Sequence, residues 1–94
     1  MFKTDNFKVK FSYYNSDGKR VPANSAEKTI TLAEVVREAS SDVYAAESWC
    51  GKYTPEKFKK PVGRKIALTR ALRFIRSKEE RAEIWAGYFA HYTK

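Results

Sequence analysis

The segment from residue 7 to residue 14 constrains the fold most, because apolar and polar residues alternate along it without a break. Phe7, Val9, Phe11 and Tyr13 share one side of the pattern. Alternation with a period of two is typical of a half-buried β-strand. The sequence therefore predicts a sheet that packs one face against a core.

Turn and strand signals follow this segment. The residues Asn15-Ser16-Asp17-Gly18 predict a tight turn, because Asp-Gly supplies the positive φ that hairpin turns require. Residues 19–23 are expected to begin a return strand, which Pro22 confines to an edge or to the strand's end. Residues 43–50 read as another strand, since Ser and Asp precede them and Gly51 follows.

Residues 24–42 fit two descriptions. Residues 29–32 are typical of a short strand, but Thr31-Leu32-Ala33-Glu34 is also a capping box ahead of apolar positions at helical spacing. We favour the helix, over residues 32–39.

The C-terminal half predicts two helices and a short turn before them. Thr54-Pro55 is typical of an N-cap followed by proline in the first helical position, and it predicts a turn through Phe58. A helix is expected over residues 61–76, and Ser77-Lys78-Glu79-Glu80 is a capping box that starts the next one. The apolar face of the first helix is predicted to contain Ala67, Leu68, Ala71, Leu72, Phe74 and Ile75. The apolar stripe of the second is predicted to contain Ile84, Trp85, Tyr88, Phe89 and Tyr92.

These elements predict an α+β fold, with two or three antiparallel strands packed against a C-terminal helical pair. With 94 residues, the chain is expected to form one domain over residues 1–94. No apolar run approaches the roughly 20 residues that cross a bilayer. Charged residues near the N-terminus argue against a signal peptide, and a single cysteine forms no internal disulfide, so a cytoplasmic protein is expected.

The surplus of positive over negative charge lies in one quarter of the chain. The formal net charge is +8, yet residues 1–51 and 77–94 are each neutral. Residues 52–76 hold nine basic residues and one acidic residue, Glu56. The surface of the folded protein should therefore be positive on one side.

The block KPVGRKIALTRAL, residues 60–72, resembles the C-terminal part of small bacteriophage and prophage proteins without an assigned function. Glu79-Glu80-Arg81, Ile84-Trp85 and Tyr88 continue the resemblance, which covers roughly residues 57–92. It implies a setting and no mechanism: a phage product in the bacterial cytoplasm, where small proteins inhibit host defence or redirect host machinery.

Eight basic residues are the main candidates for a binding site: Lys57, Lys59, Lys60, Arg64, Lys65, Arg70, Arg73 and Arg76. Such a cluster can contact phosphates at positions set by the helical rise, or it can be a solvated face that only aids solubility. Trp49 and Tyr53 lie among lysines and are candidates for stacking on unpaired bases, although packing in the core is the commoner role for a residue such as Trp49. Gly63 fits close helix packing better than a phosphate site. Tyr14 and Tyr44 are the tyrosines expected on an exposed face.

An enzyme is the least favoured class. Cys50 and His91 are the only nucleophile and base of the classical kind, and nothing in their spacing indicates a dyad. We expect no catalytic residue, no metal site and no cofactor.

The sequence thus favours a stoichiometric inhibitor or modulator of a host nucleic-acid-handling or defence complex, of the anti-CRISPR kind, acting through its basic helix. The alternative is a protein that binds DNA or RNA directly without sequence preference. The expected partner is a host protein or nucleoprotein complex with an acidic or nucleic-acid surface, and no membrane.

Overall fold

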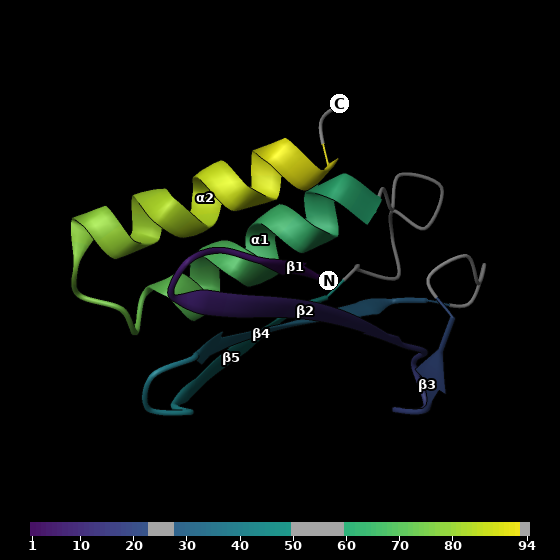
Figure 1. The fold of residues 1–94 in the computed structure, drawn as a ribbon. Helices are drawn as coiled ribbons and strands as arrows, with labels where there is room; N and C mark the ends of the chain where they lie inside the picture. Colours follow the sequence, from purple (N-terminus) through teal and green to yellow (C-terminus); the bar gives the residue numbers. More distant parts are fainter. Residues whose placement is uncertain (23–27, 50–59, 93–94) are drawn as a thin grey trace.

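A computed structural model describes residues 1–22, 28–49 and 60–92, and it shows one sheet with two helices on one face (Figure 1). In chain order the elements are β1 (Phe2–Lys3), β2 (Phe7–Tyr14), β3 (Arg20–Val21), β4 (Ile30–Arg37), β5 (Val43–Trp49), α1 (Lys60–Leu72) and α2 (Lys78–Tyr92). The predicted α+β class is confirmed. The sheet has five strands, more than the two or three expected.

All strand pairs are antiparallel, in the order β1-β2-β4-β5. β4 pairs with β2 along all eight residues, so β1 and β3 both pair with the opposite edge of β2. β1 pairs at Lys8 and Val9, and β3 pairs at Tyr13 and Tyr14. β2 and β4 are therefore the central strands, and β5 is an edge strand in the described part of the sheet.

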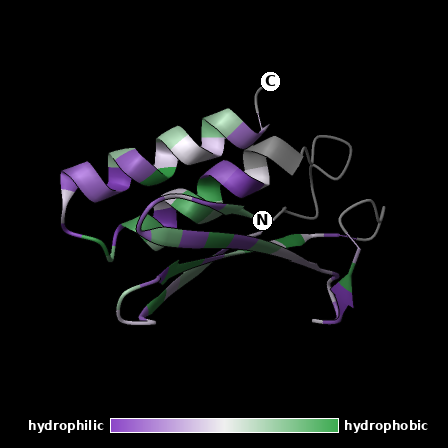
Figure 2. Ribbon diagram, in the orientation of Figure 1, coloured by the Kyte–Doolittle hydropathy of each residue, from purple (hydrophilic) through white to green (hydrophobic). Residues whose placement is uncertain are grey.

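The half-buried strand predicted from the alternation of apolar and polar residues is confirmed in β2. Figure 2 shows hydrophobic and hydrophilic residues following one another along this strand. Phe7 and Val9 are fully buried beneath the helices, while Lys10 is exposed on the other face. The predicted turn is confirmed as well, since Gly18 has a φ of 80° and its N–H donates to the Asn15 carbonyl at 3.0 Å.

The helix predicted over residues 32–39 is wrong, because this segment belongs to β4. β4 is paired on both sides, and this pairing satisfies its backbone groups better than an isolated two-turn helix would. Its β-branched residues, among them Thr31, Val35 and Val36, also suit a strand. β5 confirms the strand predicted over residues 43–50 up to Trp49; Cys50 lies outside the described residues.

The helices cover the face of the sheet that holds the core. Residues from β1, β2, β4, α1 and α2 form one buried cluster, which contains Phe2, Phe7, Val9, Ala33, Val35, Ala67, Leu68, Ala71, Leu72, Ile75, Ile84 and Tyr88. Tyr44 packs against this cluster, so the expectation that it lies on an exposed face is wrong. None of the described helices lies on the opposite face of the sheet (Figure 1).

The link between the helices differs from the prediction in one respect. α1 ends at Leu72, four residues earlier than expected, and the N–H groups of Arg73, Phe74 and Ile75 donate to carbonyls three residues back. This tighter turn leaves Phe74 64% exposed, whereas we predicted it on the apolar face. The N-cap half of the Ser77 capping box is confirmed, because the Ser77 hydroxyl accepts from the Glu80 N–H at 3.2 Å. The Glu80 carboxylate pairs with Arg37 of β4.

Candidate binding surface

α1 holds the candidate surface in a fixed position. Its buried side, which includes Ala67, Leu68 and Ala71, packs on β4 and β5 and leaves the opposite side of the helix in solvent. Four of the predicted basic residues are exposed there or directly after it: Lys65, Arg70, Arg73 and Arg76. We call these four residues the basic face.

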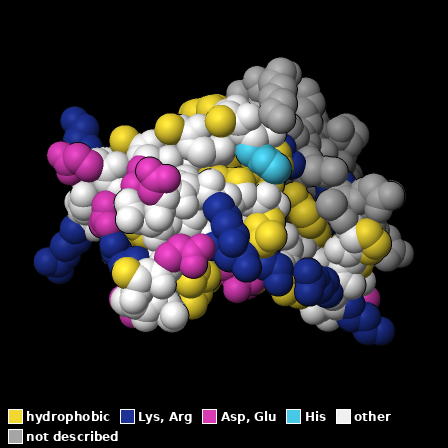
Figure 3. All heavy atoms as spheres, viewed as in Figure 1, with side chains coloured by type: hydrophobic (Ala, Val, Ile, Leu, Met, Phe, Trp, Pro, Cys, Tyr) yellow, Lys and Arg dark blue, Asp and Glu magenta, His cyan; other side chains and the backbone are white. Residues whose placement is uncertain are grey.

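No carboxylate of the described residues forms an ion pair with the basic face. The acidic residues of α2 that lie near in sequence are used elsewhere. Glu80 is paired with Arg37 of β4, and Glu83 accepts hydrogen bonds from Thr4 and Asn6. Figure 3 shows acidic side chains gathered over the start of α2, with basic side chains near them. The charge of the basic face is therefore not neutralised within the described part of the protein.

The side chains of the basic face differ in the contacts that they make with the rest of the protein. The Lys65 ammonium lies 5.7 Å from the centre of the Phe89 ring, and Arg70 donates to the Glu47 carbonyl of β5 at 2.9 Å. The side chains of Arg73 and Arg76 make no hydrogen bond to any described residue. Arg73 lines a hollow of about 320 Å³ between the helices, together with Thr69, Leu72, Arg81 and Trp85.

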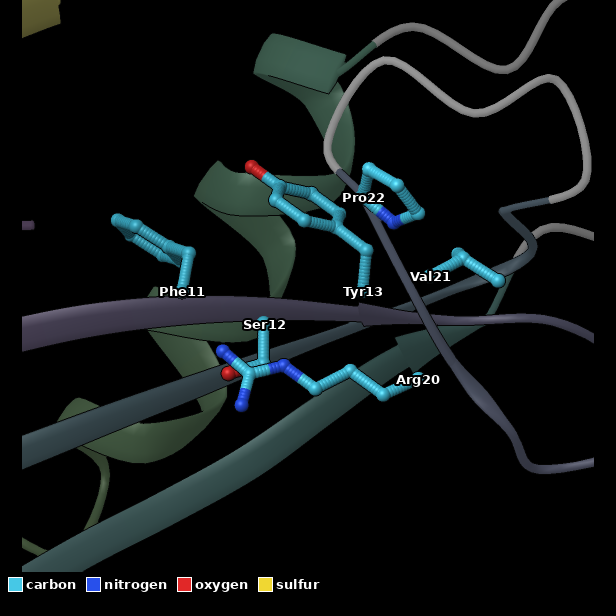
Figure 4. Close-up of a pocket in the computed structure, with 6 residues that line it drawn as sticks. All are labelled: Phe11, Ser12, Tyr13, Arg20, Val21 and Pro22. Carbon is cyan, nitrogen blue, oxygen red and sulfur yellow. The ribbon is translucent and has the colours of Figure 1, made fainter.

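Arg64 was predicted as a binding residue, but the structure buries it. The side chain is only 7% exposed, and its guanidinium lies 4.2 Å from the centre of the Tyr92 ring. Burial opposes the charge of Arg64, but hydrogen bonds with Tyr13 and Tyr88 outweigh this effect and raise its pKa. Figure 4 shows the Tyr13 hydroxyl directed toward the start of α1. Arg64 therefore anchors α1 to the sheet.

Several of the remaining candidates fall outside the described residues. Lys57, Lys59 and Tyr53, and the turn predicted over residues 54–58, lie outside the described residues; of Lys60 the structure gives only its place as the first residue of α1. Gly63 is buried, in agreement with the packing role. Trp49 is 63% exposed on the face of the sheet opposite the helices, so its core interpretation is wrong, and its indole N–H donates to the Glu47 carboxylate at 3.0 Å.

A second hollow, of about 410 Å³, lies at the outer edge of β2, where β1 and β3 leave a gap. Phe11 and Tyr13 point from it toward the helices, and Ser12 and Arg20 point to the other side of the sheet (Figure 4). No group of three or more His, Cys, Asp or Glu able to hold a metal ion occurs among residues 1–22, 28–49 and 60–92.

Sequence reasoning missed Arg81, which joins the helices. Its Nη1 donates to the carbonyls of Ile75 and Arg76, at 2.6 and 2.9 Å, and so satisfies two backbone groups of the link between α1 and α2. Its position four residues after Ser77, the first residue of the capping box, is a weak signal, because the sequence does not show where the preceding helix ends.

Comparisons with protein-family models, with curated proteins and with solved structures give no match for this chain. Among the described helices, none is both long and apolar enough to cross a membrane.

Proposed function

We propose that this protein is a binding protein without catalytic activity, which inhibits or modulates a nucleic-acid-handling or defence complex of a bacterial host. It acts stoichiometrically, in the host cytoplasm, through the basic face. The observation that carries this proposal is a set of four exposed cations, held on and directly after one packed helix, without a carboxylate partner among the described residues.

The physical support is the cost of leaving these charges together. Like charges on and directly after one helix repel one another, and a partner with an acidic or phosphate-lined surface turns this repulsion into attraction. Since α1 is fixed by its buried side and by Arg64, the backbone that carries Lys65 and Arg70 is already ordered when a partner binds. The phage setting rests on the resemblance of residues 57–92.

The proposal is tested by phage plaquing on bacteria with an active CRISPR system. Expression of the chain should restore plaquing of a targeted phage, and the combined change Lys65→Glu, Arg73→Glu and Arg76→Glu should abolish this effect. The matched control reverses three exposed lysines elsewhere, Lys3, Lys10 and Lys19, and should keep it. If the basic-face variant restores plaquing as well as the control does, the basic face is not the working surface.

Direct binding to DNA or RNA is the second candidate, and the same four cations favour it. A titration with unrelated DNA and RNA should then give roughly micromolar affinity that falls by about two orders of magnitude between 50 and 200 mM salt. If neither nucleic acid binds at the lower salt concentration, the second candidate fails and a protein partner remains.

A further inference from the structure

The outer edge of β5 presents backbone groups that the described part of the sheet does not use. In the β4–β5 hairpin, the Arg37 N–H donates to the Asp42 carbonyl at 2.9 Å. Hydrogen-bonded pairs alternate along an antiparallel ladder, so the next such pair is Val35 with Tyr44. The residues of β5 that fall between these pairs direct N–H and C=O away from β4; they are Val43, Ala45, Glu47 and Trp49.

Arg70 confirms this assignment independently. Its Nη1 reaches the Glu47 carbonyl at 2.9 Å, which requires this carbonyl to be accessible from outside the ladder. A cation of α1 therefore lies directly at the edge of β5 that no described strand pairs with.

Two exposed apolar residues flank Arg70 in the sequence. Ile66 and Phe74 lie four residues before and after it, and they are 40% and 64% exposed. Residues four apart lie one above the other on a helix face, so Ile66 lies over Arg70 on α1. Phe74 lies in the turn directly after the end of α1. We call Ile66, Arg70 and Phe74 the edge row.

The spacing of Ile66 and Arg70 on α1 matches that of an extended chain. Four residues of helix rise about 6 Å, and two residues of a strand rise about 6.6 Å. Two side chains on one face of a strand added to β5 would therefore match the step from Ile66 to Arg70. On the other face of the sheet, the intervening side chains would meet Val43 and Trp49, which are 56% and 63% exposed.

We propose that β5 accepts an extended segment of the partner protein as an additional strand. The segment carries an apolar, an acidic and an apolar residue at alternate positions, which face Ile66, Arg70 and Phe74. Its N–H groups bond the outward carbonyls of β5, and its carboxylate receives the Arg70 guanidinium. This inference rests on the proposed function and deepens it, because it names the part of a partner protein that binds.

A second copy of the chain fits this edge less well. On the helix side, β5 itself carries Tyr44, Ala46 and Ser48, so a second β5 offers no carboxylate to Arg70. Pairing two copies would also bring two basic faces toward one seam, in a protein whose net charge is already +8. An acidic segment removes both objections.

The test uses the full chain and the synthetic peptide Thr-Leu-Thr-Glu-Thr-Leu-Thr, with a control peptide that carries Lys in place of Glu. Amide hydrogen exchange by NMR should slow at least tenfold at Val43, Ala45 and Glu47 when the acidic peptide is present. We expect the Lys peptide to bind at least fivefold more weakly, and Phe74→Ala to weaken the acidic peptide several-fold.

The sharpest variant is Ala45→Pro, which removes one outward N–H and no hydrogen bond to β4. It should weaken the peptide at least tenfold, whereas Ala45→Thr, which keeps the N–H, should not. The amide spectrum of β4 reports whether the β4–β5 ladder survives the Ala45→Pro change. If the ladder does not survive, the effect of Phe74→Ala on binding of the acidic peptide tests the inference instead.

The inference is overturned if the peptide does not slow exchange along β5 at millimolar concentration, or if the Glu and Lys peptides bind equally. It is also overturned if sedimentation shows a dimer that protects the same amides without peptide. The triple Glu variant at positions 65, 73 and 76 leaves the edge row intact, so it should still bind the peptide. A variant that loses plaquing but still binds the peptide has therefore lost the function of the basic face. A variant that keeps plaquing but no longer binds the peptide has lost the function of β5.

Discussion

α1 and α2 cover the same face of one sheet, but they use their charged side chains in opposite ways. In α2 the described contacts engage Glu80 with Arg37, Glu83 with Thr4 and Asn6, and Arg81 with the link that follows α1. In α1 and directly after it, Arg73 and Arg76 have no described hydrogen-bond partner for their side chains. The comparison teaches that the number of charged residues on a helix does not indicate whether the helix binds a partner. A better indication is whether those residues already have contacts within the protein.

Arg64 is the exception within α1, and changing it should give the largest effect. Arg64→Ala removes the guanidinium packed on Tyr92 and leaves the hydroxyls of Tyr13 and Tyr88 without this partner. We expect a loss of about 2–3 kcal/mol in the free energy of unfolding, measured with urea. Arg73→Ala is the matched control and should change it by less than about 0.5 kcal/mol. Equal effects would contradict the division between anchored and free charges.

The position of α2 depends on a close approach to β1, and Gly87→Ala tests it. A Cβ at Gly87 would lie 2.7 Å from Thr4 Cγ2 and 3.0 Å from the Phe2 ring. Alanine favours the helix by up to about 1 kcal/mol, but the crowding should outweigh this gain and cost about 1–2 kcal/mol net. Ala86→Gly, at the exposed neighbouring position, separates packing from helix propensity. A stabilised Gly87→Ala variant would show that β1 moves aside.

Acid should weaken the contacts of α2 before it affects the charges of α1. Hydrogen bonds from Arg37 lower the pKa of Glu80, and hydrogen bonds from Thr4 lower the pKa of Glu83. A lowered pKa in the folded state stabilises the protein above the unfolded value, about 4.5, and this contribution is lost as the pH falls through the folded pKa.

Glu83→Gln should therefore cost about 1 kcal/mol at pH 7 and flatten the loss of stability below pH 4.5. Urea unfolding at pH 7, 5, 4 and 3 measures both effects. Glu79→Gln is the control, because Glu79 contacts only the neighbouring Ser77 among the described hydrogen bonds. If Glu83→Gln shows the pH dependence of the unchanged protein, the link from α2 to the turn after β1 contributes nothing to stability.

How far the sequence predicts this fold depends on how local the signal is. β2, the turn at Gly18 and the start of α2 follow from neighbouring residues, and all three are confirmed. β4 does not, because the segment also contains a helical capping pattern, and only pairing with two strands distant in sequence decides between helix and strand.

The binding surface shows the same limit at the level of side chains. Counting charges placed Arg64 in the binding set, although it lies four residues before buried Leu68 and so shares its face. That signal was present in the helical pattern. The contact between Arg70 and the Glu47 carbonyl was not, since it depends on how α1 crosses the edge strand.

The smallest expected effect sharpens the comparison most directly, because it concerns charges that contribute little to stability. Arg73→Gln with Arg76→Gln should raise the free energy of unfolding slightly at low salt, by a few tenths of a kcal/mol, since it relieves repulsion on a chain of net charge +8. Between 20 and 500 mM salt this difference should vanish, because screening relieves the same repulsion in the unchanged protein. Glu80→Gln should behave oppositely and destabilise most at low salt, where the pair with Arg37 is strongest. If the double Gln variant is instead destabilised, Arg73 and Arg76 hold the fold together, and the basic face is not a free surface kept for a partner.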